Sequence, residues 1–339
     1  MAAPALIASL GAGRMGRGIA HAFAYAGHQV LLVDIKQRPE AEIRKLEAGA
    51  LAEIDSSLRA LAGLGAFDDA RRAGILSRIR FVSRDDAGPA LREARFVFEG
   101  VPEVLEAKRE AFAFACPLLA PDAILASTTS TFLSSELAGF VTAPARFLNA
   151  HWLNPAYLIP LVELSPHPGT DVAALDGMKS VLEAMGKVPV VCSAAPGFIV
   201  PRLQSLLMNE AARMIEQGVA TAEDIDKATR HGLGFRYASM GVVEFIDFGG
   251  NDILYYASRY LAQALGDQRY AAPEIVDRYM QEGRNGVRSG QGFYDWREVD
   301  TDSYRKDALG RLLAMLRHQD KLLPPGAALD EGNTSKEKS

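Results

Sequence analysis

The stretch Ala5-Leu6-Ile7-Ala8-Ser9-Leu10-Gly11-Ala12-Gly13-Arg14-Met15-Gly16 decides the fold, because a short apolar run passes directly into a G-x-G-x-x-G pattern. A helical stretch follows, and a second apolar run over 29–33 ends in Asp34. In this order and spacing the pattern is typical of a βαβ unit that binds a dinucleotide. The three glycines permit a tight turn, close approach of backbone to a pyrophosphate, and close packing of the helix on the strand.

The glycine loop and the acid after the second run together predict the cofactor. The N-terminus of the helix after the loop offers free N–H groups and a positive dipole end to phosphates. Asp34 can accept hydrogen bonds from ribose hydroxyls and repels a 2′-phosphate, which favours NAD, although Lys36 and Arg38 leave an opening for NADP. A glycine-rich turn without a ligand is the alternative. The predicted cofactor contacts are Gly11, Gly13, Arg14, Met15, Gly16 and Asp34.

Length and charge exclude several classes of protein. A chain of 339 residues predicts two domains. Its net charge of −5 argues against nucleic acid or an anionic membrane as the main partner. No apolar stretch approaches the ~20 residues of a membrane span, and the first residues lack the basic region of a signal peptide. We therefore expect a small-molecule substrate and no membrane association.

The two cysteines, Cys116 and Cys192, lie far apart in apolar contexts and form no C-x-x-C pattern. We expect buried free thiols rather than a disulfide or a metal site. This usage indicates a reducing compartment, so we expect a cytoplasmic protein without a bound metal.

The order of strand and helix patterns predicts the architecture. Strand-like runs recur at 5–10, 29–33, 95–100, 123–127, 146–151, 158–164 and 187–192. Helical patterns separate the early runs, including a long one over 41–64 that continues at 68–78. This alternation predicts an α/β fold, a Rossmann-type doubly wound parallel sheet over 1–194. Helical spacing from Val200 onward predicts an all-helical C-terminal domain over 195–327, and the polar tail at 328–339 is predicted to be disordered.

One histidine and one glutamate are placed for acid–base chemistry. His151 ends a predicted strand, Glu163 lies within the next, and a turn at Asn154-Pro155 could bring them together. A carboxylate between Val and Leu needs a partner, because an unpaired buried charge is costly. An imidazole held in this way keeps its other nitrogen free as a general base near neutral pH. A structural histidine with an unrelated, exposed glutamate is the alternative.

With these residues in view, the sequence resembles the 3-hydroxyacyl-CoA dehydrogenases over roughly residues 5–296. The most specific segments are Gly11–Gly16, Glu99–Glu103, Ala126–Ser130, His151–Glu163, Pro196–Val200 and Gly290–Tyr294. The resemblance implies that the His–Glu pair is catalytic, that the cofactor is NAD, and that the helical domain forms a homodimer.

The resemblance also implies roles for single positions. Ser130 matches a serine that hydrogen-bonds and polarises the substrate oxygen, and Asn154 matches an active-site asparagine. A strand-end serine and a turn asparagine before proline are the alternatives. Glu103 and Lys108 match residues near the nicotinamide ribose, or else they form a pair of surface charges. Ser57 matches a residue kept in the CoA-binding members of the family.

Two departures from the family concern the substrate. Pro201 stands where the family has an asparagine that supports the substrate carbonyl, so that contact is absent unless Asn209 or another group replaces it. Leu64 stands where the CoA-binding helical stretch carries a lysine. The basic residues left to meet the CoA phosphates are Arg59, Arg71 and Arg72.

Two segments, Gly232–Ala238 and Ile159–Pro168, are closer to the lambda-crystallin branch, whose members resemble L-gulonate 3-dehydrogenase and act on free hydroxy acids. In that case Arg236 could pair with a substrate carboxylate; the alternative is an arginine solvated in a loop. The leading hypothesis is NAD-dependent oxidation of a short-chain L-3-hydroxyacyl-CoA to the 3-oxoacyl-CoA, and the runner-up is the same chemistry on a free 3-hydroxy acid. A third hypothesis is a retired, crystallin-like structural protein that still binds NAD, against which the intact His151 and Glu163 argue.

Overall fold

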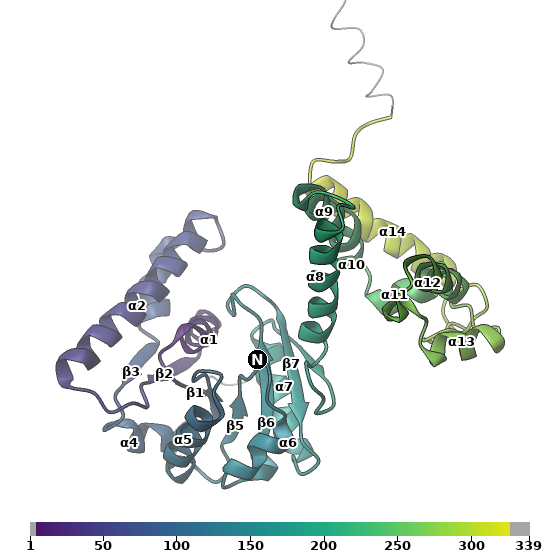
Figure 1. The fold of residues 1–339 in the computed structure, drawn as a ribbon. Coiled ribbons are helices and arrows are strands. Elements are labelled where there is room, and N and C mark those ends of the chain that lie inside the picture. Colours follow the sequence, from purple (N-terminus) through teal and green to yellow (C-terminus); the bar gives the residue numbers. More distant parts are fainter. Residues whose placement is uncertain (1–4, 326–339) are drawn as a thin grey trace, which may run out of the picture. The chain divides into compact units, whose positions relative to one another are not determined.

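The computed structural model describes residues 5–325, which form two compact units that divide between Met208 and Asn209 (Figure 1). Within these residues no helix is both long and apolar enough to cross a membrane. The predicted tail at 328–339 and the last two residues of the predicted helical domain lie outside the described part of the chain.

The first unit is built on one eight-stranded sheet with the strand order β3-β2-β1-β4-β5-β6-β7-β8. The strands are β1 (Leu6–Leu10), β2 (Gln29–Val33), β3 (Ile79–Val82), β4 (Phe96–Glu99), β5 (Ile124–Ser127), β6 (Phe147–Trp152), β7 (Leu161–Pro166) and β8 (Val188–Val191). The strands from β3 to β6 are parallel, whereas β7 pairs antiparallel with β6 and parallel with β8. This confirms the predicted doubly wound fold, and it places the switch in strand order between β1 and β4.

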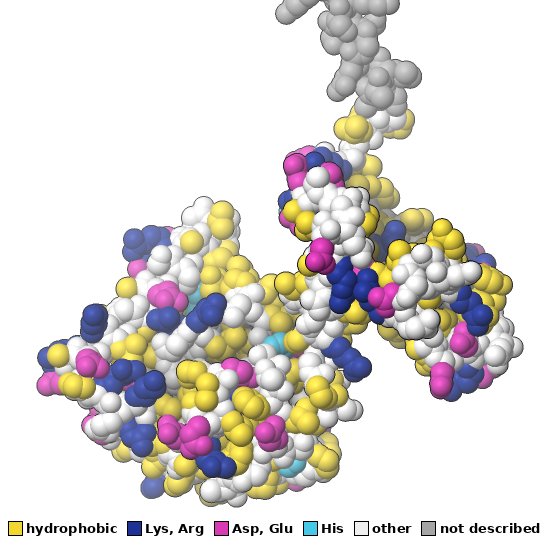
Figure 2. All heavy atoms as spheres, in the orientation of Figure 1, with side chains coloured by type: hydrophobic (Ala, Val, Ile, Leu, Met, Phe, Trp, Pro, Cys, Tyr) yellow, Lys and Arg dark blue, Asp and Glu magenta, His cyan; other side chains and the backbone are white. Residues whose placement is uncertain are grey.

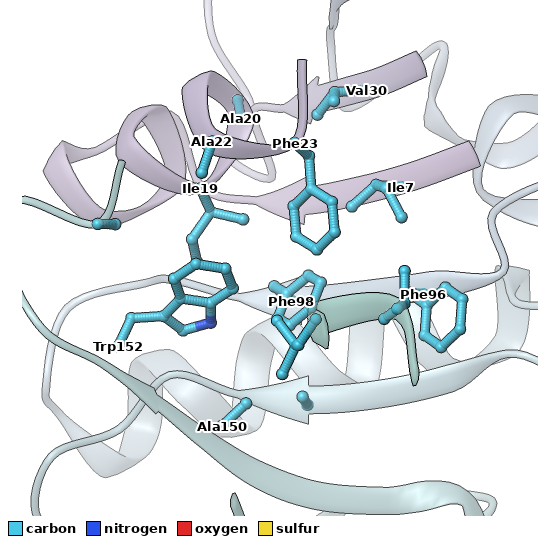
Figure 3. Packing of buried hydrophobic residues seen from close by; sticks show 14 of the residues in the cluster. Ile7, Ile19, Ala20, Ala22, Phe23, Val30, Phe96, Phe98, Ala150 and Trp152 are labelled. Carbon is cyan, nitrogen blue, oxygen red and sulfur yellow. The ribbon is translucent and has the colours of Figure 1, made fainter. Parts of the chain in front are cut away.

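Helices cover both faces of this sheet. They are α1 (Arg14–Tyr25), α2 (Glu40–Gly63), α3 (Arg72–Leu76), α4 (Ala87–Arg92), α5 (Leu105–Ala115), α6 (Ser134–Leu137) and α7 (Val172–Ala184). Alternation along β1 shows the two faces: Ile7 belongs to the core cluster that includes residues of α1, α2 and α7, while Ala8 and Leu10 belong to the cluster that includes residues of α4, α5 and α6. Three aromatic rings, Phe23, Phe98 and Trp152, join α1 to β4 and β6, with centroids 5.3–5.9 Å apart (Figure 3).

In this unit the sequence analysis missed one strand, and one prediction was wrong. The helical stretch predicted over 68–78 is present as a 3-10 turn at Asp69–Arg71 followed by α3, but the strand β3, which begins at Ile79, was not predicted. The strand escaped notice because it has only four residues and an arginine within it, and it pairs on one side only, at the edge of the sheet. Cys116 and Cys192 are free thiols but only half-buried, because the first follows the end of α5 and the second follows the edge strand β8.

The second unit is helical and is organised around one buried carboxylate. Its helices are the end of α8 (Val200–Glu216), α9 (Ala222–Ala228), α10 (Phe235–Tyr237), α11 (Val242–Gly249), α12 (Asn251–Leu265), α13 (Glu274–Gln281) and α14 (Thr301–His318). Asp247 of α11 is buried and accepts hydrogen bonds from the N–H groups of Phe293 and Tyr294 and from Trp296 Nε1, at 2.8–2.9 Å. A Cβ on Gly292 would lie 2.2 Å from Asp247 Oδ1, so the Gly290–Tyr294 segment needs glycine to fold over this carboxylate.

Candidate active site and cofactor site

The loop after β1 has the shape that a phosphate group requires. Gly11 has a φ of +99°, and its N–H donates to Val33 O at 2.7 Å, which makes the turn tight. A Cβ on Gly16 would lie 1.9 Å from Gly11 O, so only glycine lets α1 start this close to the loop. A Cβ on Gly13 would meet no atom within 4 Å. The backbone at the start of α1 is therefore open to a ligand, as an NAD pyrophosphate needs.

The glycine loop opens into a cavity of about 770 Å³, lined also by residues 34–38 and by Gly100–Pro102 after β4. Asp34 lies buried at the end of β2, and its carboxylate accepts hydrogen bonds from Arg38 Nε at 2.7 Å and from the Lys36 N–H at 3.2 Å. Two of the predicted cofactor contacts, in the first turn of α1, do not line this cavity. Met15 packs against the apolar core, and Arg14 lines a second, smaller cavity.

Buried charge lies beside this cavity. Lys108 of α5 has no exposed surface, and its Nζ lies 3.1–3.2 Å from the carboxylates of Glu99 and Glu103. The alternative of a pair of surface charges is therefore wrong, because the lysine is enclosed and Glu99, at the end of β4, is its fully buried partner. Ser127 Oγ and the Val101 N–H also donate to Glu99, so every part of this carboxylate is satisfied.

Glu103 shapes the loop that carries Ser130. Its Oε1 accepts hydrogen bonds from the backbone N–H groups of Ser130 and Thr131 at 3.0 and 2.9 Å, and from Thr129 Oγ1. Burial, the largest influence on this carboxyl, favours its protonated form. The Thr129 hydrogen bond and Lys108 more than offset it and hold the pKa of Glu103 below its ordinary value. Ser130 itself is exposed at the carboxyl end of β5.

The structure brings His151 and Glu163 together. They face each other across the antiparallel β6–β7 pair, with Nδ1 of the histidine 2.7 Å from Oε2 of the glutamate. Both side chains are buried. An ionised carboxylate can only accept, so the imidazole donates from Nδ1 and keeps the lone pair of Nε2 free. This geometry rules out the alternative of an unrelated, exposed glutamate.

The same carboxylate starts the next helix. Glu163 Oε1 accepts hydrogen bonds from the backbone N–H groups of Ile199 and Val200, both at 2.8 Å, at the first turn of α8. The turn before α8 has two consecutive positive φ angles, +79° at Gly197 and +45° at Phe198. A positive φ at phenylalanine is costly, and here it lays the ring parallel to the imidazole of His151, 5.0 Å between centroids.

Comparison with known proteins identifies the family of this chain. Residues 6–195 match the model of the 3-hydroxyacyl-CoA dehydrogenase NAD-binding domain, and residues 197–296 match that of the C-terminal domain. The chain belongs to the 3-hydroxyacyl-CoA dehydrogenase family. It is an NAD-dependent oxidoreductase, and the glycine loop and Asp34 belong to its NAD-binding domain.

Three similar proteins span most of this family member. A 3-hydroxybutyryl-CoA dehydrogenase from Bradyrhizobium diazoefficiens is 33% identical over 85% of this chain and 94% of its own. The human lambda-crystallin homolog is 34% identical over 74% of this chain and 76% of its own. The crystal structure of a 3-hydroxyacyl-CoA dehydrogenase from Archaeoglobus fulgidus has a TM-score of 0.73 at 30% identity, covering 94% of this chain and all of that one.

The other predicted substrate residues of this dehydrogenase fall into two groups. Ser57 and Asn154 line one cavity of about 310 Å³ between α1, α2 and the 154–157 loop. Arg236 belongs to the second unit. It lies on α10 and not in a loop, because the 229–237 segment continues α9 as a helix, and its guanidinium stacks 4.2 Å above the ring of Phe245.

The departures have plain structural consequences. Pro201 lies in the first turn of α8, where a missing N–H is tolerated. Asn209 follows it by eight residues, about 12 Å of helix rise, so its amide does not replace the family asparagine. Leu64 is exposed at the end of α2. Of the basic residues expected near CoA phosphates, Arg59 and Arg72 both pair with Asp55.

A buried histidine that the sequence did not single out lines the Ser57 cavity. His21 Nδ1 lies 2.9 Å from Ser57 Oγ, and the ring stacks on Tyr157 at 4.2 Å. Burial and then the charge of Lys187 lower its pKa from the ordinary 6.5 to about 4. Lys187 in turn donates to the carbonyls of Ala156 and Ile159 at 2.7 Å, which fixes the loop after Asn154.

We predict that His21 makes the stability of the protein depend on pH. Its pKa is lower in the folded than in the unfolded chain, so the unfolded state binds more protons between pH 6.5 and 4. Folding stability from this group is full above pH 6.5 and is lost as the pH falls toward 4, by on the order of 3 kcal/mol.

Chemical denaturation at pH 7.5, 6, 5 and 4.5 measures this loss. His21→Phe keeps the stacking on Tyr157 and is expected to flatten the dependence, while His318→Phe, at an exposed position on α14, leaves it unchanged. If the free energy of unfolding depends on pH equally in the wild type and in His21→Phe, His21 is not the group responsible.

Proposed function

We propose that this family member oxidises a short-chain L-3-hydroxyacyl-CoA to the 3-oxoacyl-CoA, with His151 as the general base. The observation that carries the proposal is the 2.7 Å contact between His151 Nδ1 and Glu163 Oε2, which leaves Nε2 free to accept a proton. The O–H bond of the substrate breaks as its proton passes to Nε2, and C3 gains a carbonyl as its hydride departs. Bound NAD supplies the nicotinamide that accepts this hydride.

The protein residues divide the work of this reaction. Glu163 holds the tautomer of His151 and stabilises the imidazolium that forms when it takes the proton. Ser130 hydrogen-bonds the reacting oxygen, and its loop is positioned by the three donors that converge on Glu103. Asn154 completes the substrate site beside the cavity that also contains Ser57. In the reverse direction the imidazolium protonates the developing alkoxide.

Two predicted cofactor residues act differently from each other in this proposal. Glu103 is about one-third exposed, so its Oε2, which also pairs with Lys108, is within reach of a hydroxyl of the nicotinamide ribose. Lys108 is fully enclosed between two carboxylates and acts through Glu103, whose charge and position it fixes. A retired protein that still binds NAD would need Asp34, and Glu163 could hold the start of α8, but such a protein has no use for a His151 imidazole with a free Nε2. This disfavours that hypothesis.

A free 3-hydroxy acid is the second candidate substrate, and specific observations favour it. Pro201 and the exposed Leu64 remove two contacts that the resemblance assigns to acyl-CoA binding. Arg236 has no ion-pair partner within residues 5–325, and its guanidinium rests on an aromatic face with its N–H donors available to a carboxylate. The similarity to the human lambda-crystallin homolog points the same way.

We further propose that the chain works as a cytoplasmic homodimer. In the second unit α12 leaves a row of large apolar side chains, Ile253, Tyr256 and Tyr260, more than half exposed at helical spacing. Such a row on one helix face is typical of a subunit interface.

We predict that His151→Ala lowers turnover by about 10²–10⁴-fold, because it removes the general base. NADH binding, measured by fluorescence, stays intact, since the glycine loop and Asp34 are untouched. His318→Ala, an exposed histidine on α14, serves as the matched control and keeps full activity. Unchanged turnover in His151→Ala contradicts the mechanism.

Three substrates decide the substrate class. Acetoacetyl-CoA and free acetoacetate are tested by following NADH oxidation, and L-gulonate is tested by following NAD reduction. Turnover of the thioester alone supports the leading proposal, and turnover of free acids alone supports the second. Arg236→Met is expected to abolish activity on a free acid and barely alter it on a thioester. Arg230→Met, an exposed arginine in the same helical run, is the control. If Arg236→Met spares both activities, Arg236 is not a substrate ligand.

Multi-angle light scattering at micromolar concentration is expected to give twice the chain mass of 36.6 kDa. A monomer under these conditions contradicts the proposed homodimer.

A further inference from the structure

The lining of the cofactor cavity carries a net positive charge, and two of its cations follow Asp34 directly in the chain. Three cations line the cavity, Lys36, Arg38 and Arg84, against two carboxylates, Asp34 and Glu110, which leaves a net charge of +1 among the described lining residues. On the face shown in Figure 2, Lys and Arg side chains lie around the start of α2, interspersed with Asp and Glu side chains. A net positive charge attracts the phosphate groups of a dinucleotide, and the position of each cation decides which phosphate it can meet.

The residue that should reject NADP is already neutralised. Asp34 discriminates between the two cofactors when its carboxylate is free to repel a 2′-phosphate. Here Arg38 Nε donates to Asp34 Oδ2 at 2.7 Å, with Asp34 only 5% exposed. A guanidinium has five N–H donors, and in Arg38 the remaining contact is a distant one, 3.7 Å to the exposed Glu42. Arg38 can therefore hold Asp34 and still offer its outer N–H groups to a phosphate.

Neighbouring contacts hold the other charges in place. Arg84 stacks 4.1 Å above the ring of Phe114 and donates to Ile35 O, which fixes its guanidinium at the cavity wall. The two acidic residues that follow Arg84 in the sequence, Asp85 and Asp86, already accept hydrogen bonds. Gln37 Nε2 donates to both oxygens of Asp85 at 3.2 Å, and Ser83 Oγ donates to Asp86 at 2.6 Å. Both carboxylates keep their charge, but among residues 5–325 neither forms an ion pair with Arg38 or Arg84.

We propose that this site binds NADP(H) as well as NAD(H), with Arg38 as the residue that accepts the 2′-phosphate. Lys36 and Arg38 lie in the segment that connects β2 to α2, and this segment also contains Asp34. The hydride and proton steps are the same with either cofactor. The chain is therefore a dehydrogenase of dual cofactor use, in which Arg38 sets the ratio of the two affinities.

Direct binding tests the proposal without any substrate. Dissociation constants for NADH and NADPH are measured by nicotinamide fluorescence, and those for 5′-AMP and adenosine 2′,5′-bisphosphate by calorimetry, at the same ionic strength. In the wild-type protein NADPH is expected to bind within about 100-fold of NADH. In Arg38→Met the preference for NADH is expected to rise at least about tenfold, since one charge-assisted phosphate contact is lost.

Matched variants separate the alternatives. Arg44→Met, which removes a surface arginine of α2 paired with Glu40, is expected to leave the ratio unchanged. Lys36→Met, at an exposed position that tolerates substitution, is expected to raise the preference about threefold or more. A wild-type ratio above about 100-fold, or an equal loss of both cofactors in Arg38→Met, overturns the proposal. These outcomes do not depend on whether the substrate is a thioester or a free acid.

Discussion

The arrangement of this active site depends on one buried carboxylate, that of Glu163. A carboxylate without exposed surface is tolerated only when hydrogen bonds replace its lost water. Here one oxygen receives Nδ1–H of His151 and the other receives two backbone N–H groups at the start of α8. The register of β6 against β7, the tautomer of the histidine and the first turn of α8 are therefore fixed by the same group.

The neighbouring strand solves the same problem in another way. Glu99, at the end of β4, is equally buried, but its main partner is the cation Lys108, which it shares with Glu103. Glu163 is satisfied by backbone N–H groups and by an imidazole, so in the proposed reaction its surroundings would change charge as His151 takes the proton. Glu99 faces a permanent cation, so its surroundings keep a constant charge. The first arrangement suits proton transfer, and the second suits fixed positioning of the Ser130 loop.

The sequence was sufficient where a local pattern carries the chemistry. The loop at Gly11–Gly16 and the acid at Asp34 follow from backbone requirements within one βαβ unit. The pairing of His151 with Glu163 was one of two interpretations that the spacing left open, and the family resemblance favoured it. It failed where the partner comes from a distant element. Nothing in the sequence around Glu99 predicts that its partner is Lys108, which lies on the helix that follows the strand. The positive φ of Phe198 leaves no signal in the sequence either, since no β-turn pattern of Asn or Asp accompanies it.

The first turn of α8 shows why Pro201 is compatible with the fold while removing a substrate contact. Every backbone N–H there is accounted for: those of Ile199 and Val200 go to Glu163, that of Arg202 goes to Gly197 O, and that of Leu203 goes to Ile199 O. The remaining position in this turn is 201, where a backbone N–H would have no acceptor. Proline has no N–H, so it leaves no donor unsatisfied there.

Proline at this position therefore suits the helix start, and it provides no amide for the carbonyl of a substrate. That carbonyl lies two bonds from the carbon that loses hydride, so a contact to it orients the substrate without taking part in the proton transfer. Under the proposed function, Pro201 therefore removes one contact to the substrate carbonyl and leaves the His151–Glu163 pair unchanged.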